Sequence, residues 1–218
     1  MTSDTGDRIL NSAEQLFATR GLAAVTLRDI TAAADVNLAA VNYHFGSRGG
    51  LIEAVLRRRL EPLKRARLDN LHHLEKGAAG KPLPLEDIIY AFVSPLIRIS
   101  QDPTQGGAVA MQLLGRASLD TTPRFRDFFD AEHKPVLDRY HAAFVKAAPY
   151  LSADQVYWRL RSMIGALIFP IPELYATPGS GRVHLQRYMQ NLVPFVAAGF
   201  RAPGGDFTTL TLRPMGSR

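Results

Sequence analysis

Apolar residues at helical spacing are the feature that most limits the folds open to this chain of 218 residues. Near the start they follow the i, i+3, i+4, i+7 pattern of one helical stripe, at Ile9, Leu10, Ala13, Leu16 and Phe17. Gly21 follows this stripe, and glycine often ends a helix because it adopts left-handed backbone angles without steric cost. The alternation typical of strands is almost absent, apart from a weak pattern after Asp206. The sequence therefore predicts an all-α fold.

Residues 26–45 carry the signals of two short helices. Thr26 precedes LRDITAAA in the position of an N-cap, with Asp29 three residues later. A short turn at Asp35 and Val36 follows, and Asn37 stands where it can cap a helix over residues 38–45. Two short helices joined by such a turn and braced by a third form a helix-turn-helix.

Six further helices are expected, which makes about nine in total. The first is long and basic, from about residue 49 to 76, and the linker KGAAGKPLP follows it at 76–84. The others are expected at residues 85–100, 106–119, 122–148, 152–175 and 182–201. Pro170 and Pro172 are expected to kink or stop the fourth of these. We expect a helix-turn-helix domain at 1–50, a connector helix at 49–76, a second helical domain at 77–205 and a tail at 206–218.

Composition excludes several classes of protein. The chain is 46% apolar and 21% charged, which fits a folded protein with a sizeable core. It has no cysteine, so disulfides, thiolate catalysis and cysteine-bound metals are excluded. The polar start is unlike a secretion signal, and the apolar runs are shorter than the roughly 20 residues that cross a bilayer. We therefore expect a cytoplasmic protein with no membrane partner.

Positive charge is concentrated in the first part of the long helix. The net charge is +6, and residues 48–67 hold more arginine and lysine than acid. Such a balance weakly favours an anionic partner. A solvated helix face explains the same run, and we expect Arg57, Arg58 and Arg59 to lie on such a face.

The short helix at residues 38–45 has two different sides on a helical wheel. One is apolar and is expected to pack against Ile30 and Leu16; it holds Leu38, Val41 and Phe45. The other has low relief, with hydrogen-bonding rings at its end; it holds Ala39, Ala40, Tyr43 and His44. The major groove of DNA admits a helix whose leading side chains are short, and hydroxyl and ring donors suit phosphates. We expect this side to contact DNA.

These residues also carry a family resemblance. TLRDITAAADVNLAAVNYHFGSRGGLIEAV (26–55) resembles the N-terminal domain of the TetR family of bacterial transcription regulators. The resemblance covers about the first 60 residues, including AEQLFATRG at 13–21, and beyond residue 60 only length and helix count match. The same sequence segment is also similar to the branch of the family that responds to fatty acids or their thioesters.

The resemblance implies DNA contacts for particular residues. Thr26, Tyr43 and Arg48 would bind phosphates, with Arg48 at a position where the family usually has lysine. Arg28 would reach the edge of the groove. The full expected set is Thr26, Arg28, Asn37, Leu38, Ala39, Ala40, Asn42, Tyr43, His44 and Arg48. Two alternatives stay open: Asn37 acts only as an N-cap, or His44 only braces the start of the next helix.

Some positions depart from the family pattern. Asp35 replaces a turn glycine, and Gly49–Gly50 replace an acidic pair. Leu38, Ala39 and Ala40 replace more polar residues, which leaves few groups to hydrogen-bond bases, so DNA shape is expected to contribute to specificity.

The remaining 140 or so residues are expected to join two copies and to bind a ligand. A helix-turn-helix protein that reads a palindrome acts as a dimer. The resemblance implies that the last two helices form its interface, with Ile164, Leu167, Ile168, Leu192 and Phe195. Burial of these residues in the subunit's own core is the alternative.

The helices between are rich in phenylalanine, methionine and leucine, which suit an apolar cavity or a closed core. The expected lining is Phe92, Leu96, Met111, Leu114, Phe128, Phe129 and Met163. Polar groups for such a cavity are scarce; the candidates are Gln112, Arg116, His133 and Tyr140. An apolar pocket with one basic group suits an amphipathic acid.

Other classes have little support in the sequence. It has no Gly-x-Ser-x-Gly elbow and no phosphate-binding glycine loop, so we expect no enzyme and no cofactor. His72 and His73 diverge by about 100° on a helix and cannot face one metal ion. The sequence predicts a repressor that binds a palindromic operator as a homodimer and is released by a small hydrophobic effector such as a fatty acid or acyl-CoA. The alternative is an architectural DNA-binding protein without an effector.

Overall fold

The computed structural model describes residues 2–102, 106–117, 122–175 and 181–204. Every regular element in these ranges is a helix, so the all-α prediction is confirmed. The helices are α1 (Thr2–Arg20), α2 (Leu27–Ala34), α3 (Leu38–Phe45), α4 (Arg48–Ala78), α5 (Leu85–Gln101), α6 (Gly107–Ala117), α7 (Pro123–Ala147), α8 (Ala153–Ile168), α9 (Ile171–Leu174) and α10 (Gly181–Arg201).

The described residues form ten helices where the sequence predicts about nine. The difference lies at residues 152–175, which fold as α8 and the short α9 rather than as one helix. Pro170 stands between them at the N-cap of α9, because proline has no N–H to continue a helix. The other predicted bounds agree to within two residues where the chain is described. The predicted tail at 206–218 lies outside the described residues.

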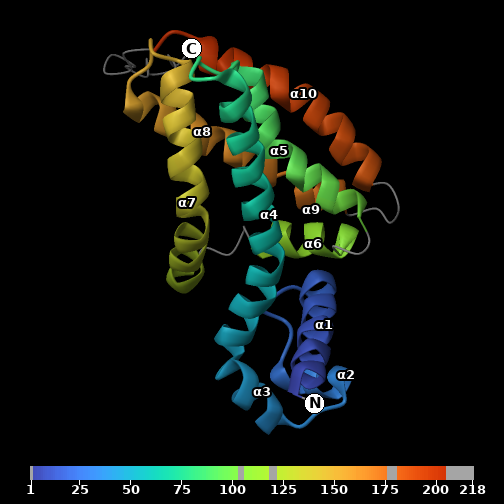
Figure 1. Ribbon diagram of the computed structural model, residues 1–218. Coiled ribbons are helices and arrows are strands. Elements are labelled where there is room, and N and C mark those ends of the chain that lie inside the picture. Colours follow the sequence, from blue (N-terminus) through green and yellow to red (C-terminus); the bar gives the residue numbers. More distant parts are fainter. Residues whose placement is uncertain (1, 103–105, 118–121, 176–180, 205–218) are drawn as a thin grey trace, which may run out of the picture.

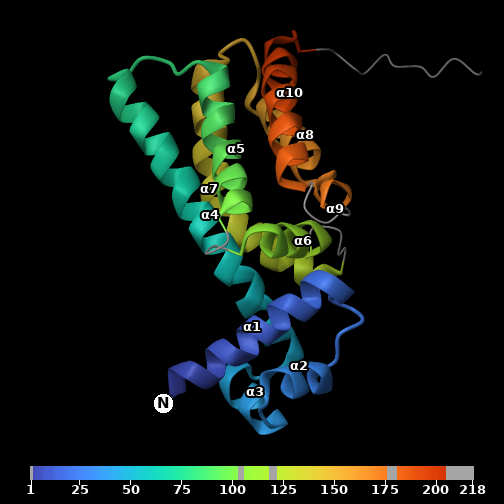
Figure 2. The same ribbon diagram turned by 90° about the vertical axis from the view of Figure 1, so that its right-hand side faces the viewer.

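Helix α4 runs the length of the molecule. Its first turns lie beside α3, and its later turns lie in a bundle with α5 and α7 (Figure 1). At the far edge of this bundle α8 and α10 lie side by side (Figure 2). Helix α6 crosses the end of the bundle and packs on α1. The α1–α3 unit therefore touches the rest of the chain through both α4 and α6.

The hydrophobic core extends into the α1–α3 unit. Ile9, Phe17, Ile30 and Val41 are fully buried in it. Leu38 is 47% exposed, so the expectation that it packs on this side is wrong.

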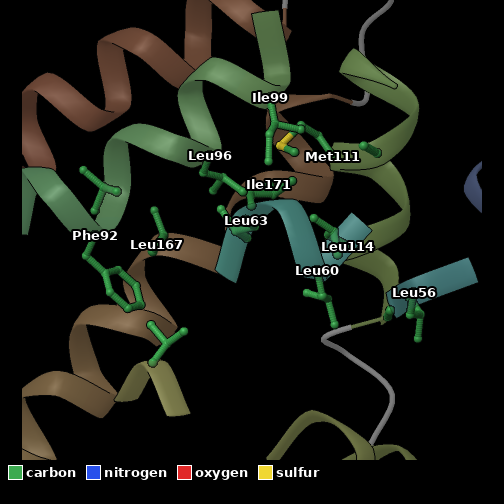
Figure 3. Close-up of a cluster of buried hydrophobic side chains, with 14 of the residues drawn as sticks. Leu56, Leu60, Leu63, Phe92, Leu96, Ile99, Met111, Leu114, Leu167 and Ile171 are labelled. Carbon is green, nitrogen blue, oxygen red and sulfur yellow. The ribbon is translucent and has the colours of Figure 1, made fainter. Parts of the chain in front are cut away.

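The larger part of this core surrounds α5. Most residues of α5 from Leu85 to Ser100 are buried, because α4, α6, α7 and α10 all contact it. Figure 3 shows apolar side chains from α4, α5, α6, α8 and α9 converging there, among them Leu63, Leu96, Leu114 and Ile171. This convergence leaves the cavity described below.

Candidate nucleic-acid interface and ligand pocket

Helix α2 begins with a capping box. The Thr26 hydroxyl accepts a hydrogen bond from the Asp29 N–H at 3.2 Å, and the Asp29 carboxylate accepts one from the Thr26 N–H at 2.8 Å. The hydrogen bonds from Thr26 lower the pKa of Asp29. This local arrangement fixes the start of α2, as the Thr26–Asp29 spacing predicts.

The turn between α2 and α3 is held from both sides. Asp35 adopts left-handed angles (φ 51°, ψ 56°), as expected for a residue that replaces a turn glycine. Arg8 of α1 donates to the carbonyls of Ala34 and Asp35 at 2.6 and 2.8 Å. Asn37 caps α3, with its side-chain oxygen 2.9 Å from the Ala40 N–H. Asn37 is therefore an N-cap, and its predicted contact with bases stays a prediction. Arg8 is a brace that the sequence did not indicate.

One surface of α2 and α3 stays open. Its residues make few contacts within the chain, and the exposed members of the predicted set are Thr26, Arg28, Asn37, Leu38, Ala39, Asn42 and Tyr43. Tyr43 is 80% exposed. Ala40 and His44 are half-buried. Most of the predicted residues are thus accessible on α2, α3 and their N-caps.

His44 packs against α1. Its ring lies against Gly6 of α1, close enough to touch a Cβ placed on that glycine. It also makes an edge contact with the Tyr43 ring, with centroids 5.2 Å apart. The ring therefore packs against α1, and its predicted contact with DNA stays a prediction.

Arg48 is directed into the protein rather than outward. Its guanidinium donates to the Val25 carbonyl, at 3.2 Å from Nε and 3.0 Å from Nη2, and to the Leu22 carbonyl. These contacts tie the first turn of α4 to the loop between α1 and α2. The predicted phosphate contact of Arg48 stays a prediction, since these bonds use Nε and Nη2 and none to a described residue uses Nη1.

Gly50 is needed where α3 meets α4. A Cβ at this position would overlap the carbonyl oxygen of Phe45. The Ser47 hydroxyl caps α4 by accepting from the Gly50 N–H at 3.1 Å. The guanidinium of Arg124, from the start of α7, covers Gly49 and forms an ion pair with Glu53 at 2.7 Å.

A cavity of about 440 Å³, open to solvent on one side, lies between the helices of the bundle. Its apolar wall comes from α4, α5, α6, α7, α8 and α9, with Leu60, Leu63, Leu96, Leu114, Phe129, Leu137, Ile164, Gly165, Ile168 and Ile171, and Phe169 lies at its edge. Its polar wall consists of Arg67, Arg126, Asp130, His133 and Arg161. The volume falls in the range of small-molecule sites, roughly 300–1,000 Å³.

Three of the seven predicted lining residues reach this cavity: Leu96, Leu114 and Phe129. The other four, Phe92, Met111, Phe128 and Met163, are buried but do not line it. Phe92 is covered by the Arg67 guanidinium, 3.8 Å from its ring centroid. Phe128 faces Arg57 of α4, whose guanidinium lies 5.4 Å from its ring centroid. These four residues fill the space between helices instead.

Of the four predicted polar candidates, only His133 lines the cavity. Burial, together with the nearby Arg67 charge, lowers the pKa of His133, so its ring is neutral at pH 7. The hydroxyl of Tyr140 donates to the Arg67 carbonyl at 2.8 Å, and burial raises the pKa of that hydroxyl. Gln112 donates to the Tyr175 carbonyl instead. Arg116 is exposed and points toward Gly21.

Ion pairs connect the α1–α3 unit with the bundle. Arg59 of α4 and Glu14 of α1 are both largely buried and paired twice, at 2.5 and 2.8 Å. The Arg59 guanidinium also lies against Gly106, just before α6. Near the cavity, Arg57 pairs with Glu132 of α7 at 2.9 Å. Helix α4 therefore contacts both the α1–α3 unit and α7 of the bundle through charged side chains.

The predicted dimer residues divide into two groups. Leu167 and Leu192 are buried in the subunit's own core, at 0% and 4% exposure, so their assignment to an interface needs correction. Ile164 and Ile168 line the cavity. Phe195 is 73% exposed on α10.

Other exposed aromatic residues accompany Phe195 at this edge. Trp158, Ser162, Gly165 and Phe169 are exposed and recur every three or four residues, on one stripe along and just after α8. Trp158 and Phe169 are 60% and 76% exposed. The sequence did not single out this stripe, because two small residues separate its two aromatic residues.

Two kinds of site are absent from the described part of the chain. No group of three or more metal-ligating side chains comes together within it. No helix there is both long enough and apolar enough to span a bilayer.

Comparisons with known proteins agree with this geometry. Residues 9–55 match the family described as bacterial regulatory proteins, tetR family, and residues 90–199 match the tetracyclin repressor-like C-terminal domain. The probable HTH-type transcriptional regulator YttP of Bacillus subtilis is 42% identical over 53 residues, which are 24% of this chain and 26% of that protein. The chain therefore aligns with about a quarter of this curated relative.

Solved structures share the fold over most of their length. GusR of Salmonella enterica superposes with a TM-score of 0.60 at 18% identity, covering 91% of this chain and 96% of that one. PfmR of Thermus thermophilus, a TetR family transcriptional regulator, superposes with a TM-score of 0.59 at 18% identity, covering 86% and 94%. Since the C-terminal match alone spans half of the sequence, the chain belongs to the TetR family, whose members are DNA-binding transcription regulators and not enzymes.

Proposed function

We propose that this protein is a transcriptional repressor which binds a palindromic operator as a homodimer and is released by a small hydrophobic effector. The observation that carries the proposal is the course of α4. One end of this helix supports the open surface of α3, and its middle supplies Leu60, Leu63 and Arg67 to the cavity. A single rigid element thus joins a surface suited to DNA with a cavity suited to a ligand.

The α3 surface suits the major groove for steric and electrostatic reasons. Ala39 and Ala40 allow close approach of the helix and can contact thymine methyl groups. The free hydroxyl of Tyr43 and the side chain of Arg28 can reach phosphates. Arg28 makes no side-chain hydrogen bond or ion pair with any residue that the structure describes, which leaves its guanidinium available.

In the dimer, the two α1–α3 units can adopt different relative arrangements. An effector would act by binding one of these arrangements more tightly than the other. Two contacts offer routes for this coupling. Leu114 of α6 lines the cavity, and α6 packs directly on α1. Arg57 and Arg59 of α4 are paired with α7 and α1. A ligand that displaces α4 or α6 would therefore shift α1–α3. The family resemblance suggests a fatty acid or an acyl-CoA.

The cavity also bears on the alternative function. An architectural DNA-binding protein needs no internal site, so a filled core would favour it. A cavity of about 440 Å³ with both apolar and charged walls favours the regulator with an effector.

We place the dimer interface on the exposed faces of α8 and α10, including Trp158 and Phe195. Replacing Trp158 with Asp is expected to give a folded monomer by sedimentation, with weaker operator binding. Tyr90, on α5, is equally exposed at 60%, so Tyr90→Asp is a matched control that is expected to stay dimeric. A dimeric Trp158→Asp protein would refute this placement.

Selection of bound duplexes from a random pool tests the function as a whole. The full chain is expected to enrich an inverted repeat, with half-sites about one helical turn apart. Affinity for the enriched duplex should fall steeply with salt. Tyr43→Ala should weaken binding by about 1–3 kcal/mol, alike for specific and unrelated DNA. Absence of any enriched sequence would contradict the proposal.

A further inference from the structure

The cavity contains a buried cation that has no anionic partner in the described part of the chain. Arg67 lines the cavity and is only 4% exposed. Its Nε donates to the Phe92 carbonyl at 2.9 Å, and its guanidinium stacks on the Phe92 ring. No described residue accepts a hydrogen bond from Nη1 or Nη2, and no described carboxylate forms an ion pair with this side chain. One edge of a fixed, planar guanidinium is therefore left unused beside the cavity.

An unpaired buried charge is costly, so its presence calls for a reason. Arg67 occupies a position in the apolar stripe of α4, together with Leu60, Leu63 and Leu71. An apolar side chain of similar volume would pack there without the penalty of removing a charge from water. Burial lowers the pKa of Arg67 to about 10, which leaves it charged at neutral pH. A bound anion would offset the burial penalty of the Arg67 charge, and binding that anion would be the function of this side chain.

The remaining polar wall also favours an anion. Arg126 and Arg161 add two cations, and Asp130 is the only carboxylate on the wall. Asp130 lies 3.9 Å from Arg161 and is thereby partly neutralised. His133 is neutral at pH 7 because its pKa is lowered. All other lining residues are apolar apart from a glycine.

We propose that the effector is an amphipathic monocarboxylate whose carboxylate is bound inside the cavity by the free edge of Arg67. Its apolar tail would lie against Leu60, Leu96 and Leu114. An arginine fork matches a carboxylate with two parallel hydrogen bonds. A coenzyme A thioester of the same acid has no carboxylate at that carbon, so the free acid is the preferred ligand. The inference rests on the proposed function only in treating the cavity as the effector site.

Calorimetric titration of the full chain without DNA tests the inference. The probes share one tail and differ in the head: decanoate, decanol, decyltrimethylammonium and decanoyl-coenzyme A. Decanoate should bind about 10- to 100-fold more tightly than decanol, as expected for hydrogen bonds to a charged group. Arg67→Met should abolish this preference. Arg65→Met, which removes an exposed guanidinium of the same helix that does not line the cavity, should keep it.

Folding of the variants is checked by thermal unfolding. Arg67→Met is expected to be at least as stable as the parent chain, because it removes a buried charge. If it fails to fold, Arg67→Lys replaces it and should bind decanoate less tightly than the parent chain, since lysine lacks the planar fork. Equal binding of decanol and decanoate by the parent chain, or tighter binding of the thioester, would overturn the inference.

Failure of this inference can be distinguished from failure of the proposed function. If all four probes bind alike, the cavity is a ligand site without charge selectivity, and the inference alone fails. If none binds, the inference also fails, while the duplex selection decides separately whether the protein reads DNA.

Discussion

The position of the Arg48 side chain leads to a specific prediction about stability. Arg48→Met removes the donors that now satisfy the carbonyls of Leu22 and Val25. Hydrogen bonds from a charged donor contribute roughly 1.5–3 kcal/mol each. Arg48 is half-buried, so water can replace part of this loss, and we expect a destabilisation of about 2 kcal/mol. For a chain of this length, that corresponds to a fall in Tm of about 4–8 °C.

Thermal unfolding and DNA affinity, measured on the same proteins, separate the two roles considered for Arg48. Arg28→Met is the matched control, since its exposed side chain makes no hydrogen bond within the described chain. It should leave Tm unchanged, within about 0.5 kcal/mol of stability, and lower DNA affinity. If Arg48→Met leaves Tm unchanged and lowers DNA affinity as Arg28→Met does, Arg48 is a phosphate ligand and the bracing role is refuted.

Two further predictions follow from the geometry. In urea unfolding, Gly50→Ala should destabilise the protein by about 1–3 kcal/mol, because the added Cβ would overlap the Phe45 carbonyl. Gly77→Ala in the same helix should instead be neutral or stabilising, since open space surrounds this glycine. Equal effects of the two substitutions on the free energy of unfolding would contradict this prediction. The lowered pKa of His133 means that the unfolded chain binds its proton more readily, so its contribution to stability is full above pH 6.5 and is lost as pH falls below that value. In denaturant titrations between pH 5 and 8, the free energy of unfolding should fall less steeply with decreasing pH for His133→Gln than for the parent chain. Parallel pH dependences of the two proteins would refute the buried neutral ring.

Local features of the fold could be predicted from the sequence because their causes are local. The caps at Thr26 and Asn37, the left-handed turn at Asp35 and the helix end at Gly21 each depend on residues within three or four positions. All four are found in the structure. The family motif added the expectation that the surface of α3 faces DNA.

Long-range contacts could not be predicted in the same way. Arg48 and Arg67 both belong to one basic run, yet one binds carbonyls of the α1–α2 loop and the other lies in the cavity wall. A signal was available for Arg67, since it continues the stripe of Leu60 and Leu63 at helical spacing. No comparable signal existed for Arg48, whose partners are backbone atoms more than 20 residues away.

The sequence was equally ambiguous about which partner the apolar side of a helix packs against. Helical periodicity shows that Leu167 and Leu192 share an apolar side with their neighbours, but it does not show whether that side meets the same subunit or a second one. In the structure both are buried within the subunit, whereas Phe195 is exposed. Four predicted cavity residues failed for the same reason, because phenylalanine and methionine fill a packed core as readily as they line a pocket.

Binding of the selected duplex by Ala39→Asp tests the central claim, that the open surface of α3 reads DNA. Ala39 is exposed in the first turn of α3, where a carboxylate favours the helix and should not impair folding. Against DNA the same carboxylate would face phosphates and bases, and affinity should fall about 10- to 100-fold. Ala142→Asp, on the exposed side of α7, places the same charge elsewhere and should leave affinity unchanged. Equal affinity of the folded Ala39→Asp protein and the parent chain would contradict the account.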